Sequence, residues 1–152
     1  MTSRPDPQSD GVSAWQRQMA ALAFDSAAAT GAEQDEFVGL ALSLLQAMPQ
    51  QLVQATGRSP VPDVAPLLGA GAPTEAALAL LGGWAGYMLS CGAGGRPMAT
   101  VVVEALGGEA SAEGATPALA LLGALAALLA GDALDDDCSA QVDWRTTGVR
   151  LN

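Results

Sequence analysis

The sequence contains neither lysine nor histidine, and it has only two cysteines, Cys91 and Cys138. Without histidine the chain lacks the most frequent general base of enzymes and the most frequent metal ligand of proteins. The two cysteines make neither a disulfide framework nor a paired zinc-binding spacing. We therefore expect no metal site and no cofactor, and we favour a non-enzymatic protein over an enzyme.

Positive charge is scarce: six arginines stand against 16 acidic residues, which gives a net charge of -10. The arginines are scattered along the chain, whereas contact with nucleic-acid phosphates requires clustered basic side chains. Anionic membrane surfaces likewise recruit polybasic segments. The charge pattern predicts no nucleic-acid partner and leaves self-association or another protein, including a basic one, as the expected partner.

Charged residues of both signs make up only 14% of the chain, and hydrophobic residues make up 50%. An ordinary globular domain has roughly 25% charged residues. So few charged side chains do not readily cover a monomer of this size, and large exposed apolar patches usually mark interfaces. The composition predicts a subunit of a homo-oligomer or of a larger complex.

Ionisable residues are concentrated towards the two ends of the sequence. This distribution predicts a disordered polar tail over residues 1–12, a single helical domain over 13–131 and an acidic tail over 132–152. The first apolar run, Met19 to Phe24, is too short for a secretory signal. We expect a cytoplasmic protein, and the complete lack of lysine beside arginine, with many alanines and glycines, is typical of a GC-rich bacterial genome.

One hexapeptide, Ala-Leu-Ala-Leu-Leu-Gly, occurs at residues 77–82 and again at 118–123. Each copy opens a stretch that is apolar on all sides of a helix, and such helices are buried. The sequence predicts central helices over 75–91 and 117–130, the second one started by Thr116 as N-cap and Pro117 as first helical residue.

Amphipathic helices are expected outside this pair, over 13–29 and 33–48, with Thr30 and Glu33 as a capping box for the second. Residues 98–106 carry an apolar stripe, and their valine run could favour a strand. A helix is predicted there, because the sequence offers no obvious second strand, and residues 108–115 are expected to form a loop. The predicted fold is all-α, a compact bundle of five or six helices.

A short helical solenoid is the alternative fold. Related pentapeptides begin at Ala41, Ala77 and Ala118, and their spacings of 36 and 41 residues are near the period of HEAT-like repeats. The segments between them do not match, so the irregular bundle is preferred.

Three motifs could carry chemistry. The loop Gly92–Arg96 resembles a phosphate cradle but lacks a preceding strand and a lysine. The acidic cluster Asp132–Asp137 lacks the ligand pattern of an EF-hand, so no metal is predicted there. If the chain is an enzyme, Cys91 beside Arg96 is the pair to test. Each motif is better explained as a helix stop, a solvated turn or a structural thiol.

Uncharged runs over 76–95 and 114–131 are long enough to cross a bilayer, but glycines dilute the first, and the helix start at Thr116-Pro117 shortens the second. A membrane association is possible but less favoured than buried core helices. The leading functional hypothesis is a non-enzymatic interaction or scaffold subunit. A helical carrier of an apolar ligand and a membrane-associated scaffold are the alternatives. The residues predicted for an interface or apolar pocket are Leu78, Leu81, Gly82, Trp84, Gly86, Leu121, Leu125 and Leu128.

Overall fold

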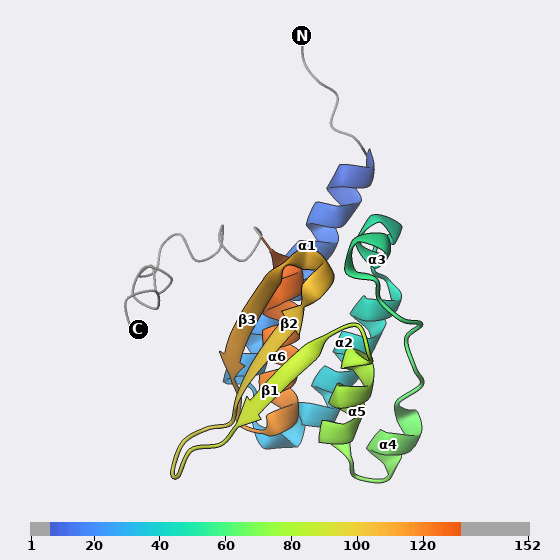
Figure 1. Cartoon of the computed structure of the whole chain (residues 1–152). Coiled ribbons are helices and arrows are strands. Elements are labelled where there is room, and N and C mark those ends of the chain that lie inside the picture. The colour runs from blue at the N-terminus through green and yellow to red at the C-terminus, as the bar shows by residue number, and fades with distance from the viewer. Residues whose placement is uncertain (1–6, 132–152) are drawn as a thin grey trace, which may run out of the picture.

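The computed structural model describes residues 7–131. Five helices come first, followed by three strands and a last helix (Figure 1). The elements are α1 (Pro7–Ala28), the 3-10 turn η1 (Gly31–Glu33), α2 (Gln34–Gln46), α3 (Gln50–Thr56), α4 (Ala65–Gly69), α5 (Pro73–Leu81), β1 (Gly86–Ser90), β2 (Met98–Val103), the 3-10 turn η2 (Glu104–Leu106), β3 (Gly108–Glu113) and α6 (Pro117–Ala130).

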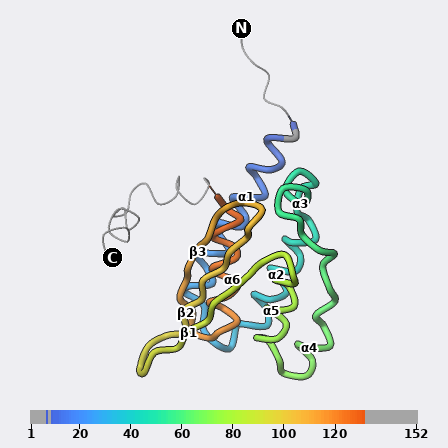
Figure 2. The backbone as a smooth tube through the Cα atoms, in the orientation of Figure 1, coloured from blue at the N-terminus to red at the C-terminus, as the bar shows by residue number. Residues whose placement is uncertain are grey.

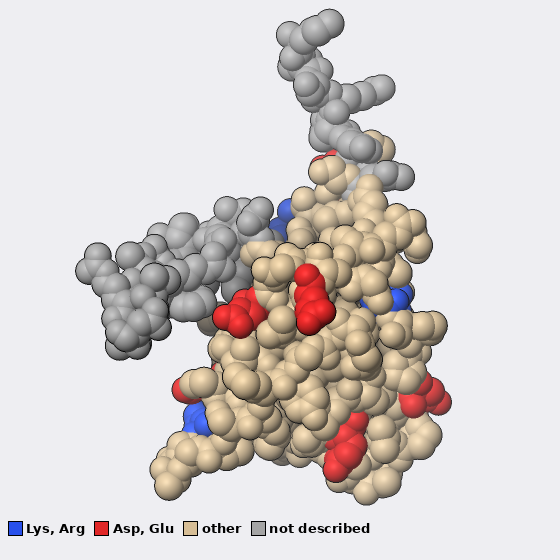
Figure 3. Space-filling view, viewed as in Figure 1, with Lys and Arg blue, Asp and Glu red and all other residues tan. Residues whose placement is uncertain are grey.

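The last helix, α6, is the centre of the molecule. One of its sides packs on the sheet, mainly on β2 and β3, and α1, α2 and α5 pack around the rest (Figures 1 and 2). The sheet is an antiparallel meander in the order β1-β2-β3. No helix of the described residues covers its other face, which is the face seen in the space-filling view (Figure 3).

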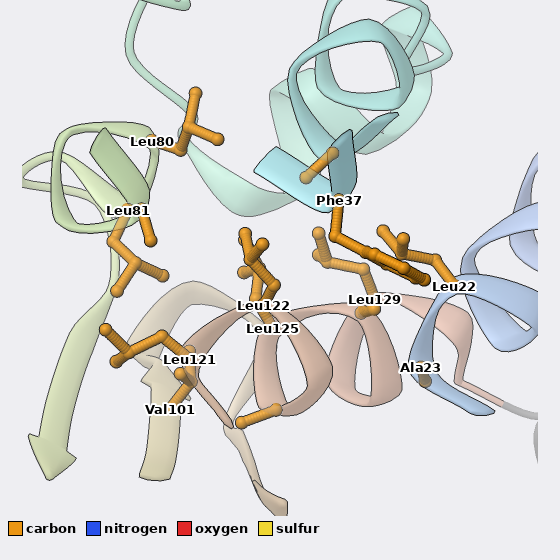
Figure 4. Close-up of a cluster of buried hydrophobic side chains, with 14 of the residues drawn as sticks. Leu22, Ala23, Phe37, Leu80, Leu81, Val101, Leu121, Leu122, Leu125 and Leu129 are labelled. Atoms are coloured by element: carbon orange, nitrogen blue, oxygen red, sulfur yellow. The ribbon is translucent and has the colours of Figure 1, made fainter. Parts of the chain in front are cut away.

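The prediction of a buried helix over 117–130 is confirmed. Eleven of the residues of α6 are buried, and they lie on every side of the helix. The Thr116 hydroxyl accepts a hydrogen bond from the Leu119 N–H at 3.2 Å, as expected of an N-cap. In the core, Leu121 of α6 lies beside Val101 of the sheet, while Leu129 lies close to Leu22 and Phe37 of the helical layer (Figure 4).

The all-α prediction is wrong, because three strands form an antiparallel sheet. The predicted helix 75–91 ends at Leu81, and its second half is strand β1. The helix predicted over 98–106 is strand β2 followed by η2, and the loop predicted over 108–115 contains β3. The valine run lies in β2, which pairs with β1 on one side and with β3 on the other.

Gly82 and Gly83 explain why the helix stops early. Gly82 has φ +54° and ψ -154°, a combination that only glycine adopts readily. A Cβ at Gly82 would also lie 3.2 Å from the Cδ1 atom of Trp84. The chain therefore leaves the helix at Gly82 and turns into β1.

The alternation of side chains in β2 and β3 explains the sheet. Ala99, Val101 and Val103 are buried against the helical layer, while the residues between them face outwards. In β3 the small residues Gly108, Ala110 and Ala112 lie opposite those three, and the polar Glu109, Ser111 and Glu113 are exposed. This is the period of two that a sheet with one covered face requires.

The solenoid alternative is also wrong, because the three pentapeptides do not occupy equivalent positions. The one at Ala41 lies inside α2, the one at Ala77 ends α5, and the one at Ala118 begins α6.

The amphipathic helices are present, with shifted boundaries. Helix α1 begins at Pro7, so residues 7–12, assigned to the disordered tail, are helical. The Trp15 indole N–H donates to the Leu44 carbonyl at 2.8 Å and joins α1 to α2. The predicted acidic tail, 132–152, lies outside the described residues.

The capping box at Thr30 is confirmed. One carboxylate oxygen of Glu33 accepts hydrogen bonds from the Thr30 backbone N–H at 3.1 Å and from the Thr30 hydroxyl at 2.9 Å. The backbone bond, and then the hydroxyl bond, hold the pKa of Glu33 below its ordinary value. Both bonds stabilise the ionised carboxylate.

A carboxyl group whose pKa is lower in the folded state stabilises the fold above its unfolded-state pKa, and this stabilisation is lost as the pH falls through the folded-state pKa. We expect NMR titration of the side-chain carbon to place the pKa of Glu33 below the ordinary value of 4.5. In Thr30→Val, which lacks the hydroxyl, the pKa should rise part of the way back. An unchanged Glu33 pKa in this variant would contradict the hydroxyl contribution.

Candidate interaction surface

Exposed apolar side chains gather on the hairpin formed by β1 and β2. Seven large apolar side chains are exposed among the described residues, and four of them belong to this hairpin. We call these four the β1 surface: Tyr87, Met88, Leu89 and Met98. Met88 has 71% of its surface exposed, and all five residues of β1 are exposed. A strand exposed on both faces is unusual in a protein whose other strands alternate.

The β1 surface includes both faces of the strand. Met88 lies opposite Thr100, on the outer face of the sheet. Tyr87 and Leu89 lie opposite the buried Val101 and Ala99, which places them on the inner face. They remain exposed because α6 covers mainly β2 and β3 and reaches little of β1. The helical layer thus stops one strand short of the edge of the sheet.

The backbone of β1 also has an unused edge. The Gly114 N–H donates to the Pro97 carbonyl at 3.1 Å, so the odd-numbered residues of β2 bond to β3. The even-numbered residues of β2 therefore bond to Gly86, Met88 and Ser90. It follows that the N–H and C=O groups of Tyr87 and Leu89 point away from the sheet, towards a fourth strand that the described chain does not supply.

The two edges of the sheet differ in charge. Residues 76–95, which contain all of β1, include no Asp, Glu or Arg, and the surface over β1 is free of charged residues in Figure 3. The opposite edge, β3, carries Glu109 and Glu113. Charged side chains are a common protection of sheet edges against pairing with other chains. The β3 edge has this protection, and the β1 edge has none.

A hollow of about 350 Å³ lies at the start of β1. It is lined by Gly83, Trp84, Ala85, Gly86, Val102 and Glu104. A second hollow, of about 390 Å³, lies between the start of α1 and the α2–α3 junction, beside Trp15 and Pro49. Only the first adjoins the β1 surface.

The eight residues predicted for an interface or pocket do not form one site in the structure. Leu81, Leu121 and Leu125 are buried in the core, and Leu78 and Leu128 are half-buried against it. Gly82 is exposed at the end of α5. Trp84 and Gly86 do come together, at the hollow beside β1.

Sequence reasoning missed Tyr87, Met88, Leu89 and Met98 as surface residues, because residues 75–91 were interpreted as one buried helix and residues 98–106 as another helix. A signal was present. A run of eight residues with a tyrosine, 84–91, stands between Gly82-Gly83 and the glycine-rich loop 92–95, and a valine run follows that loop. Two short runs separated by a glycine-rich turn are typical of a hairpin.

The loop Gly92–Arg96 forms the tip of this hairpin. The Gly95 N–H donates to the Gly92 carbonyl at 3.0 Å. The Arg96 guanidinium donates to the Ala27 carbonyl at 2.9 Å, near the end of α1, where a cation is favourable for the helix dipole. Arg96 therefore ties the hairpin to α1, and Cys91 is an exposed free thiol. Within residues 7–131 no group of three or more acidic or cysteine side chains is placed to hold a metal ion, and Asp132–Asp137 lie outside that range.

None of the described helices combines the length and the apolar character that crossing a membrane requires. The chain matches no protein-family model, no curated protein and no solved structure.

Proposed function

We propose that the chain is a non-enzymatic interaction subunit that works in the cytoplasm as part of a homo-oligomer or a larger protein complex. The observation that carries the proposal is the edge at β1, where exposed apolar side chains occur together with backbone groups of Tyr87 and Leu89 that no other described strand pairs. A sheet edge of this kind is a template for pairing with another chain.

The packing of the interior supports this function over a carrier of an apolar ligand. A carrier needs space between its central elements. A Cβ built at Gly123, in the middle of α6, would lie 3.3 Å from the Cβ of Ala112 and 3.7 Å from that of Ser26. At this point the small residues Gly123, Ala112 and Ser26 let α6 approach β3 and α1 closely, and no room is left for a ligand.

Size-exclusion chromatography of an extract from the source cells, with antibody detection, tests the proposal. The wild-type chain should elute well above the 15.2 kDa of one copy. Met88→Asp places a charge at the β1 edge, where a charged residue opposes strand pairing. We expect this variant to elute later, at the position of a single chain.

Phe24→Asp is the matched control, because Phe24 of α1 is as exposed as Met88, at 72% against 71%. It adds the same charge away from the sheet and should leave the elution position unchanged. A wild-type chain at the monomer position, both in the extract and after purification, would overturn the proposed function.

A further inference from the structure

We propose that the partner of the β1 edge is a second copy of this chain, bound by antiparallel pairing of β1 with β1 across a two-fold axis through Met88. The two three-stranded sheets then form one continuous six-stranded sheet. This inference rests on the proposed function and names its partner.

The backbone geometry selects one register. The free N–H and C=O groups belong to Tyr87 and Leu89, so the hydrogen-bonded pairs of a new antiparallel ladder must be built from these residues. Pairing Tyr87 of one copy with Leu89 of the other, and the reverse, uses all of these groups. Met88 then faces Met88 on the axis as a non-hydrogen-bonded pair.

The side chains suit this register. Tyr87 faces Leu89 on the inner side of both sheets, so an aromatic ring packs on an aliphatic side chain, a favourable cross-strand pair. The smallest residues of the strand, Gly86 and Ser90, face each other at its two ends. The half-exposed Tyr87 of each copy thereby gains the apolar neighbour that its own helical layer does not provide.

Charge argues for the same place of contact. Each copy has a net charge of -10, so two copies repel each other over most of their surfaces. Antiparallel self-pairing of β3 about Ser111 would bring Glu109 of one copy opposite Glu113 of the other, and like charges in such positions are destabilising. Self-pairing of β1 brings no charged side chains together.

The hollow at the start of β1 leaves room for this arrangement. In the register centred on Met88, the second chain continues beyond Gly86 as Cys91 and the hairpin tip. That continuation runs along Ala85 and Trp84, which line the hollow of about 350 Å³. The hairpin tip of each copy can thus extend past the end of the other strand.

Disulfide trapping tests the register. In a chain with Cys91→Ser and Cys138→Ser, Met88→Cys places two thiols opposite each other on the axis, at a Cα separation of about 4.5 Å, which a disulfide can bridge. Mild oxidation should convert most of this variant into a covalent dimer of twice 15.2 kDa. Met98→Cys in the same background is the control, because Met98 is also exposed but lies on the neighbouring strand, away from the axis.

Light scattering on the purified wild-type chain should give twice the mass of one copy. The dimer dissociation constant should fall as salt is raised, because salt screens the repulsion between two acidic bodies. Leu89→Pro removes an N–H that points only towards the partner, and proline is tolerated at such edge positions. This variant should be monomeric, with an unchanged circular dichroism spectrum.

Three results would overturn the second copy as partner: a purified wild-type monomer, equal cross-linking of Met88→Cys and Met98→Cys, or a folded Leu89→Pro variant that remains dimeric. If the purified chain is monomeric but elutes in a Met88-dependent complex from the cell extract, the proposed function stands and the partner is a different protein. If the extract also shows only a monomer, both proposals fail.

Discussion

Gly114→Ala is expected to lower the free energy of unfolding by about 3 kcal/mol or more, and the melting temperature by about 10 °C. A Cβ at this buried residue would lie 2.6 Å from the backbone nitrogen of Ala120 and 2.8 Å from the carbonyl carbon of Leu119. These atoms belong to the first turns of α6. They cannot rotate away as a flexible side chain can, so the central helix must shift or the β3–α6 connection must distort.

The matched control is Gly39→Ala, in the middle of α2. A Cβ at Gly39 meets no atom within 4 Å, and alanine favours a helix over glycine by about 0.5–1 kcal/mol. Chemical denaturation should therefore show opposite signs for the same substitution at the two positions. Equal stability of Gly114→Ala and the wild-type chain would contradict the tight approach of α6 to the end of β3.

Leu125→Ala should lower the free energy of unfolding by about 2–5 kcal/mol. Leu125 has only 1% of its surface exposed and lies in α6, which packs against both the sheet and the helical layer. Truncation at this point removes apolar contacts from the core and leaves a cavity that elements on both sides of α6 must collapse to fill. Urea denaturation followed by circular dichroism gives the change in stability directly.

Leu40→Ala makes the same truncation on α2, where Leu40 is 46% exposed. The expected loss is under about 1 kcal/mol, because much of this side chain is already in water. A loss at Leu125 as small as that at Leu40 would show that α6 is not the centre of the core.

Helices α2 and α6 could be predicted because local signals and burial agree there. In α6, Thr116 and Pro117 begin a segment that is apolar on every side, and no strand pattern competes with it. In α2, the capping box at Thr30 marks the start and the apolar stripe gives the period of the helix.

The sheet could not be predicted from the same reasoning, because each strand becomes recognisable only beside its neighbour. The valine run of β2 is a strand signal, but β3 is composed of alanine, serine, glycine and glutamate, which have low strand propensity. Its inward side chains are small because α6 approaches closely, as the contact between Gly123 and Ala112 shows. Close packing, not propensity, selects those residues.

The repeated hexapeptide shows why local sequence was insufficient at β1. Ala77–Gly82 ends a helix, whereas Ala118–Gly123 begins one. Gly82 has a backbone conformation that a helix does not contain, whereas Gly123 is a helical residue that lets the sheet approach. After Gly123 the sequence continues with alanine and leucine, whereas after Gly82 it continues with Gly83 and Trp84. The candidate surface at β1 depends on that difference.

The position of α6 at the end of the described chain has a consequence for biosynthesis. Synthesis proceeds from the N-terminus, so α1, α2, α5 and all three strands are made before the helix that covers their apolar faces. Until residues 117–130 leave the ribosome, Val101, Leu81 and Leu22 have no central helix to pack against. The nascent chain therefore passes through a stage in which its core residues are exposed beside the β1 edge, and its core is complete only once α6 has been made.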